Sequence, residues 1–181
     1  ISKAEEQLSQ YNYPDYYENT FWSTIMGDDD HLRFIKQVSE ETKNEICVVH
    51  PDTLKSLEPS EFTDIFPSIF DNMLPLINRG VRVNVITPDS YFLILLKQKY
   101  DSVPDKHLQE NIDKFLKVGI LETKHRFTLI DNYMIIINVE NPLYPDKTLG
   151  LIKIYDTNFS QKLKAKFEEL WEAADTYILS E

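Results

Sequence analysis

Cysteine is nearly absent from this sequence: Cys47 is the single one among 181 residues. One cysteine excludes an internal disulfide, and such usage is typical of proteins from a reducing compartment. Cys47 lies in the apolar run 46–49, without a basic neighbour in sequence that would lower its thiol pKa. We therefore expect a buried, unreactive side chain rather than a nucleophile.

Positive charge is also scarce, with 19 Lys and Arg against 30 Asp and Glu. The formal net charge of −11 and the isoelectric point near 4.8 describe a surface that on average repels phosphate backbones and anionic lipids. We expect contact with DNA only through a domain outside this chain.

The sequence has no apolar run close to the roughly 18 residues that a membrane-spanning helix needs, and no internal repeat is evident. Its first residues are polar and acidic, unlike a signal peptide. We expect a soluble, cytoplasmic protein with no membrane partner. Because the chain begins at Ile1, we also expect it to be a fragment of a longer protein.

The length and the 42% hydrophobic content are sufficient for one buried core. We divide the chain into an aromatic, helical linker segment at 1–26, broken at Pro14, and a single domain at 27–181. The aromatic side chains of the first segment are expected to pack on their own domain, and a partner interface is the alternative.

The pattern of apolar residues predicts alternating helices and strands. A helix over 32–43, a strand over 45–50, a helix from 67 to the Gly80 cap and a strand over 81–86 form a βαβ crossover, which requires parallel strands. We therefore predict an α/β fold with a mixed, mostly parallel sheet flanked by helices. The remaining expected elements are helices over 91–100, 106–118 and 159–178, strands over 126–130, 133–139 and 148–155, and a loop over 141–146.

Three acidic residues, Asp28, Asp29 and Asp30, precede the first of these helices. Their charge complements the helix dipole, and Asp30 can cap the helix. A metal site using Asp30, His31 and His50 is the alternative, but no ligand spacing supports it. We expect neither a metal nor a cofactor.

The stretch 124–131 carries the most specific motif. Counting back from Asp131, it resembles the His-x-Lys-x-x-x-x-Asp motif of the phospholipase D superfamily, with Lys124 at the nucleophile position and Arg126 at the phosphate-binding lysine position. The Gly-Ser-x-Asn tetrad of active members is matched only by Asn141. The resemblance is strongest to the degenerate sensor domains of archaeal winged-helix transcription regulators of the TrmB and methanogenesis-regulator types. It is carried by 46–50, 78–83, 127–132 and 167–174.

This resemblance implies a phospholipase D-like half-domain without catalysis, because the nucleophile is missing. If 124–131 were one strand, Lys124 and Arg126 would share a face and His125 would point away from them. The two cations, with His50 and Thr87 at strand ends, form the candidate ligand-binding set for a small anionic metabolite. Alternatively, the cations are solvated or paired with acidic side chains, and Asp131 is more readily explained as a turn residue.

Three functions remain open. The favoured one is a non-catalytic ligand-sensing and dimerisation domain of a transcription regulator, a homodimer with a DNA-binding winged helix upstream. The second is a divergent phosphodiesterase or nuclease that uses His125 or His50. The third is a protein-interaction module that works through the aromatic residues of 1–26.

Overall fold

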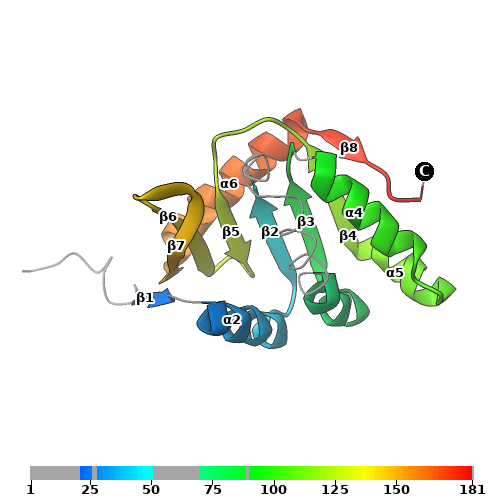
Figure 1. The fold of residues 1–181 in the computed structure, drawn as a ribbon, viewed down its shortest axis with the longest axis horizontal. Coiled ribbons are helices and arrows are strands. Elements are labelled where there is room, and N and C mark those ends of the chain that lie inside the picture. The colour runs from blue at the N-terminus through cyan, green and yellow to red at the C-terminus, as the bar shows by residue number, and fades with distance from the viewer. Residues whose placement is uncertain (1–20, 26–27, 51–69, 89, 181) are drawn as a thin grey trace, which may run out of the picture.

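The protein folds around one eight-stranded sheet with strand order β1-β7-β6-β5-β2-β3-β4-β8 (Figure 1). The computed structural model describes residues 21–25, 28–50, 70–88 and 90–180. The strands are β1 (Phe21–Ile25), β2 (Glu45–Val49), β3 (Arg82–Ile86), β4 (Leu116–Ile120), β5 (Phe127–Ile130), β6 (Met134–Asn141), β7 (Tyr144–Tyr155) and β8 (Asp175–Tyr177). The helices are α2 (Asp28–Glu41), a helix over 70–78, α4 (Ser90–Asp101), α5 (Lys106–Phe115) and α6 (Thr157–Ala173).

The α/β fold with a mixed sheet flanked by helices is confirmed, but the sheet is less parallel than the sequence suggested. Strand β3 pairs in parallel with both β2 and β4. The other pairings between the described strands are antiparallel. The reason is that β5, β6 and β7 follow one another through short turns, which can join only antiparallel neighbours.

The predicted βαβ crossover is present between β2 and β3, with the helix 70–78 between them. Gly80 has a φ of 80°, the left-handed conformation that glycine adopts without a steric cost. Its N–H donates to the carbonyl of Ile77, and the N–H of Val81 donates to that of Leu76. These bonds end the helix and turn the chain directly into β3.

Side chains of β2 alternate between two cores, one on each face of the sheet. Ile46 and Val48 contact the core under α2, the helix 70–78, α4 and α5. Cys47 and Val49, each 1% exposed, face the core under α6. The expected burial of Cys47 is thus confirmed, and the sheet's centre is covered on both sides.

Two elements near the C-terminal half were wrongly predicted. Residues 116–118, assigned to the end of a helix, belong to β4 (Leu116–Ile120), in which Leu116 and Val118 are buried and Lys117 is exposed. The predicted helix over 159–178 ends at Ala173, and 175–177 form β8 against β4. In both places sheet pairing overrides an apolar spacing that a helix would also satisfy.

Two further predictions need correction. Residues 21–25, predicted as part of a helical linker, form β1, which pairs with β7 at one edge of the sheet. The predicted loop over 141–146 is shorter, since β6 extends to Asn141 and β7 begins at Tyr144. The remainder of the aromatic segment, at 1–20, lies outside the described residues. Within the described part of the chain, no helix has both the length and the apolar character needed to cross a membrane.

Candidate functional site

The candidate residues His50 and Thr87 directly follow the parallel strands β2 and β3. The N–H of His50 donates to the carbonyl of Ile86 at 2.9 Å, and the N–H of Thr87 donates to that of Gly119 at 3.0 Å. Both residues therefore lie at the carboxyl edge of the parallel strands. Crevices outside this edge are where ligands bind in open α/β sheets.

Strand β5 runs antiparallel to β2 and brings Arg126 to the same edge. Phe127, the first residue of β5, lies opposite Val49, the last residue of β2, so Arg126 and His50 each lie one residue beyond the paired ends. The connection 121–126 starts at the carboxyl end of β4 and passes over the ends of β3 and β2 to reach β5 (Figure 1). Lys124 lies in this connection.

The fold thus places all four candidate residues at one edge, with unequal exposure. Thr87 is 2% exposed, His50 and Arg126 are half-buried, and Lys124 is exposed. Backbone hydrogen bonds fix the first two residues, whereas Lys124 lies on the exposed connection. Arg126 and Lys124 are the cations of this edge that could contact an anion.

One premise of the motif interpretation is wrong: 124–126 are not part of a strand, because β5 begins at Phe127. The alternation of faces that was expected to separate His125 from Lys124 and Arg126 therefore does not apply. His125 is exposed, and its N–H donates to the hydroxyl of Thr123 at 3.1 Å. This hydrogen bond fixes the backbone position of His125 within the connection.

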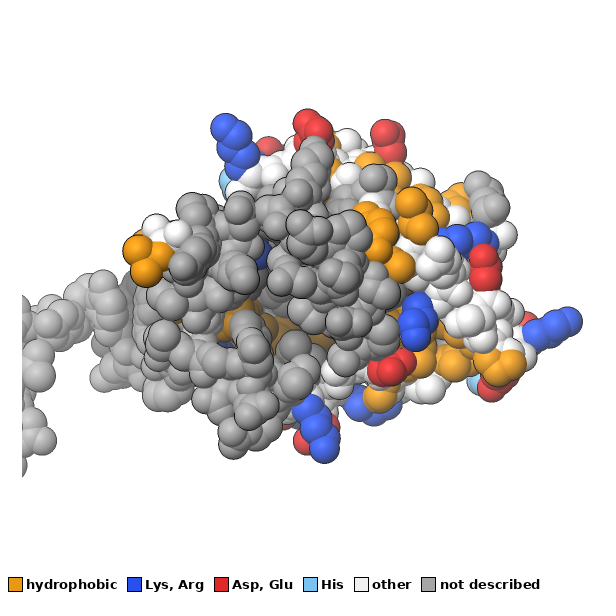
Figure 2. All heavy atoms as spheres, viewed as in Figure 1, with side chains coloured by type: hydrophobic (Ala, Val, Ile, Leu, Met, Phe, Trp, Pro, Cys, Tyr) orange, Lys and Arg blue, Asp and Glu red, His pale blue; other side chains and the backbone are white. Residues whose placement is uncertain are grey.

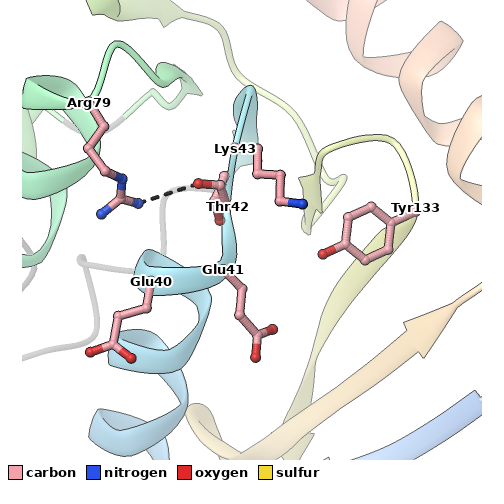
Figure 3. A pocket seen from close by; sticks show the side chains of 6 residues that line it. All are labelled: Glu40, Glu41, Thr42, Lys43, Arg79 and Tyr133. Atoms are coloured by element: carbon pink, nitrogen blue, oxygen red, sulfur yellow. Dashed lines mark hydrogen bonds between the residues drawn. The ribbon is translucent and has the colours of Figure 1, made fainter.

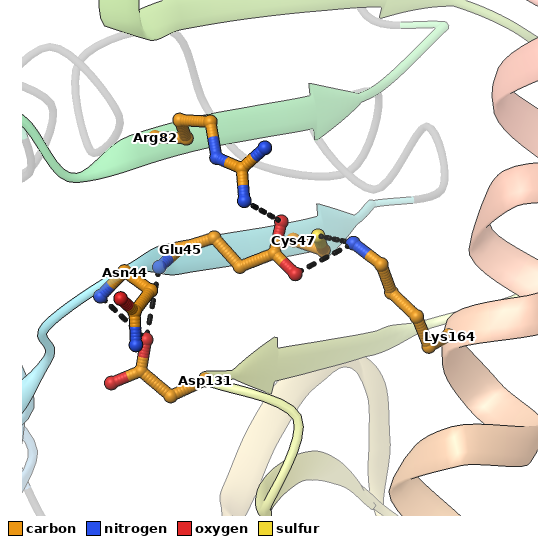
Figure 4. Close-up of polar contacts among 6 residues, drawn as sticks. All are labelled: Asn44, Glu45, Cys47, Arg82, Asp131 and Lys164. Atoms are coloured by element: carbon orange, nitrogen blue, oxygen red, sulfur yellow. Dashed lines mark hydrogen bonds and ion pairs between the residues drawn. The ribbon is translucent and has the colours of Figure 1, made fainter.

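Asp131 lies at the opposite end of β5 and has a structural role (Figure 4). Its carboxylate accepts backbone N–H bonds from Lys43 at 2.7 Å, Asn44 at 2.7 Å and Glu45 at 2.9 Å. Its φ of 48° marks it as a turn residue. The last residue of the motif therefore joins the turn after β5 to the start of β2.

The sequence did not indicate a partly buried polar cluster formed by Glu45 and Cys47 of β2, Lys164 of α6 and the exposed Arg82 of β3 (Figure 4). The Glu45 side chain is 8% exposed and pairs with Lys164 at 2.8 Å and with Arg82 at 3.5 Å. The Lys164 ammonium also lies 3.4 Å from the Cys47 sulfur. The sequence signal for this cluster was Glu45, a glutamate at the first position of an otherwise apolar strand. A carboxylate that is buried there needs a cation as its partner.

These contacts shift two pKa values in the cluster. Burial, together with the charge of Glu45, raises the pKa of the Cys47 thiol to about 11. Burial alone would lower the pKa of Lys164, but its hydrogen bond to Glu45 and the neighbouring negative charges raise it overall. Cys47 is therefore a poor nucleophile at neutral pH, as its sequence context predicted.

An open hollow of about 580 Å³ lies at the amino edge of β2, far along the sheet from the candidate set (Figure 3). It is lined by Glu40, Glu41, Thr42, Lys43, Arg79 and Tyr133. None of the four candidate residues lines it. Among the described residues, no group of three His, Cys, Asp or Glu side chains could hold a metal ion.

Charges of both signs are mixed over the described surface. On the face drawn in Figure 2, Lys and Arg side chains are scattered among Asp and Glu side chains rather than gathered in one patch. A continuous basic patch is the usual electrostatic signature of a nucleic-acid interface. The described part of this face does not have that signature.

Residues 16–177 match the sequence model of the family described as Domain of unknown function (DUF7436). No curated protein matches the chain. Among solved structures, TrmBL2, described as an archaeal chromatin protein with a novel mode of DNA binding, has a TM-score of 0.58 and 19% identity over 97% of this chain. The chain spans 62% of the TrmBL2 chain.

Two further solved structures are similar over almost their whole length. Nuc from Salmonella typhimurium, a phospholipase D family member, has a TM-score of 0.55 and 9% identity, with 88% of this chain and 99% of Nuc covered. NucT from Helicobacter pylori has a TM-score of 0.53 and 14% identity, with 87% and 99% covered. At these identities the likeness concerns the fold, which is therefore phospholipase D-like.

Proposed function

The chain belongs to the family described as DUF7436, and on its phospholipase D-like fold we propose that it is a non-catalytic ligand-sensing and dimerisation domain of a transcription regulator. Likeness to TrmBL2 over 97% of this chain supports a regulator over a free-standing enzyme. As the chain spans 62% of that protein, a DNA-binding winged helix outside residues 1–181 is part of the proposal.

The observation that carries the proposal is the composition of the carboxyl edge. Arg126 and His50 lie one residue beyond the paired ends of β5 and β2, and the connection with Lys124 crosses the same edge. The motif has Lys124 where active members of the phospholipase D superfamily have the nucleophilic histidine. Because the two cations have no nucleophile at the motif position, we infer that this edge binds an anionic group, foremost a phosphate, without hydrolysing it.

In the proposed regulator, two copies of this chain form a homodimer in the cytoplasm and set the spacing of two DNA-binding domains. The dimer would have two arrangements that differ in this spacing. A small anionic metabolite at the carboxyl edge would favour the arrangement that it binds more tightly, to an extent limited by the difference between its two affinities. The net charge of −11 per copy would keep DNA away from the sensor domains themselves.

The test is a thermal-shift titration with inorganic pyrophosphate. We expect the melting temperature to rise with concentration in the unmodified protein and to respond much less in Arg126→Ala, because ligand binding stabilises only the folded state. Lys106→Ala, at an exposed lysine that starts α5, is the control and should respond like the unmodified protein. An equal response in Arg126→Ala would remove Arg126 from the site.

One observation supports a second candidate function, that of a divergent phosphodiesterase. His50 and Arg126 lie one residue beyond the paired ends of β2 and β5, and Nuc, a phospholipase D family member, has a similar fold. This hypothesis predicts hydrolysis of bis(4-nitrophenyl) phosphate that is lost in His50→Ala or in His125→Ala. Hydrolysis that survives both substitutions, or none by the unmodified protein, would contradict it.

A further inference from the structure

The hollow at the amino edge is a second candidate site, at the opposite end of β2 from the anion site proposed above. It lies between the end of α2, the residue that follows helix 70–78 and the turn after β5 (Figure 3). Its volume of about 580 Å³ falls within the range of small-molecule sites.

One side of the hollow is acidic. Glu40 and Glu41 belong to the last turn of α2, which contains no basic residue, and both are exposed. The acidic character of this side comes from these two carboxylates, because Arg79 donates to carbonyl oxygens at the end of α2. This side favours an ammonium group.

The other side is basic and is built from Lys43 and Arg79. The Arg79 guanidinium donates to the carbonyl oxygens of Ser39 and, at 3.3 Å, of Thr42, which holds it beside the end of α2. The ion pairs among the described residues involve neither Lys43 nor Glu40. A charge of each sign is therefore available to a ligand, on opposite sides of the hollow (Figure 3).

Tyr133 forms the third side, and its ring stacks on that of Tyr155 with the centroids 6.0 Å apart. Its hydroxyl points into the hollow (Figure 3). Burial and the nearby carboxylate of Asp131 raise the pKa of Tyr133, so the phenol stays protonated and can donate a hydrogen bond.

The base of the hollow is fixed before any ligand arrives. The Asp131 carboxylate holds the N–H groups of Lys43 and Asn44 at 2.7 Å each, which ties the basic side to the turn that carries Tyr133. A site that needs little rearrangement loses less free energy on binding.

We propose that this hollow binds a small zwitterion of the α-amino-acid class. The ammonium group faces Glu40 and Glu41, the carboxylate faces Lys43 and Arg79, and the side chain lies against Tyr133. The two basic groups would repel a ligand that carries only positive charge, and the two carboxylates would repel one that carries only negative charge. Both kinds of ligand are therefore disfavoured. The proposal goes beyond the anion site at the carboxyl edge and does not depend on it.

The experiment titrates the standard amino acids one at a time into isotope-labelled protein and follows backbone amide shifts by NMR. Phenylalanine is the first probe. For each amino acid that binds, two analogues are titrated in parallel, one without the carboxylate and one without the ammonium group. For phenylalanine these analogues are phenethylamine and 3-phenylpropionate. We expect shifts at residues 40–43 and 133 with the amino acid, and binding weaker by about tenfold or more with either analogue.

Glu40→Gln and Lys43→Met should each weaken amino-acid binding by about tenfold, since each removes one charged contact. The matched controls are Glu168→Gln and Lys36→Met, which change exposed residues outside the hollow and should bind like the unmodified protein. The proposal is overturned if no standard amino acid shifts these amides, if an analogue binds as tightly, or if both Glu40→Gln and Lys43→Met bind normally. Arg126→Ala should retain amino-acid binding, which separates this result from the test of the anion site.

Discussion

Asp131 and Glu45, far apart in sequence, exchange two hydrogen bonds. The N–H of Asp131 donates to the carbonyl of Glu45 at 3.0 Å, and the N–H of Glu45 donates to the Asp131 carboxylate at 2.9 Å. The same carboxylate accepts from the N–H groups of Lys43 and Asn44. In this protein the aspartate of the phospholipase D-type motif thus fixes the junction between α2 and β2 and is distant from the candidate cations.

We predict that Asp131→Asn lowers the free energy of unfolding by about 2 to 3 kcal/mol. Asparagine tolerates the φ of 48° but offers one uncharged oxygen where the carboxylate accepts three N–H bonds. Urea denaturation would measure the loss.

The neighbouring Asn132 supplies the control for this substitution. Its φ is 58°, so Asn132→Gly keeps an allowed backbone while leaving the Asp131 bonds in place. We expect it to change stability by less than about 1 kcal/mol. If the two substitutions had equal effects, backbone conformation rather than the carboxylate would determine stability here.

The buried ion pair of Glu45 and Lys164 gives a second prediction. Lys164→Met should cost about 2 kcal/mol or more, because the Glu45 carboxylate, 8% exposed, would keep only Arg82 at 3.5 Å. The double variant Glu45→Met/Lys164→Met removes both buried charges and should be more stable than Lys164→Met alone. Unfolding midpoints of the three proteins would decide, and a double variant less stable than the single one would contradict this account.

Cys47 provides a prediction about pH. Its pKa is raised from 9.0 to about 11 by burial, so below pH 9 the thiol is protonated in both the folded and the unfolded chain. Between pH 9 and 11 the unfolded chain ionises first, and stability should fall by about 2 kcal/mol from this group. Lys164, whose pKa is also raised, loses stabilising charge as pH rises further.

The measurement is urea denaturation across this pH range in the unmodified protein and in Cys47→Ala. The variant is expected to be less stable throughout because of the cavity, but its stability should fall less steeply with pH. Lys164 and Glu45 are common to both proteins, so the difference in slope reports the Cys47 thiol together with its effect on the Lys164 pKa. Parallel slopes would show that the thiol does not titrate as the structure implies.

Sequence patterns predicted the centre of the fold well and its edges poorly. The crossover from β2 to β3 could be read from apolar alternation and from Gly80, because local chemistry determines both. Strands β1, β4 and β8 could not, since their pairing with distant partners overrides local helical spacing. These three strands therefore depend on the completed sheet.

The candidate residues were chosen at strand ends, but their local structure could not be predicted. His50, Thr87 and Arg126 share an edge because parallel strands and one antiparallel neighbour bring those ends together. The conformation of 121–126 depends on where β4 ends and β5 begins, which the residues alone do not specify. The hollow beside Tyr133 combines three segments distant in sequence, so no motif indicates it.

The central claim is that the carboxyl edge holds an anion without cleaving it, and phosphorus NMR with dimethyl phosphate tests both parts at once. The account predicts broadening of the phosphorus signal by the unmodified protein, little broadening by Lys124→Ala/Arg126→Ala, and no new signal over time. Equal broadening by that double variant, no broadening by the unmodified protein, or a growing signal of methyl phosphate would contradict it.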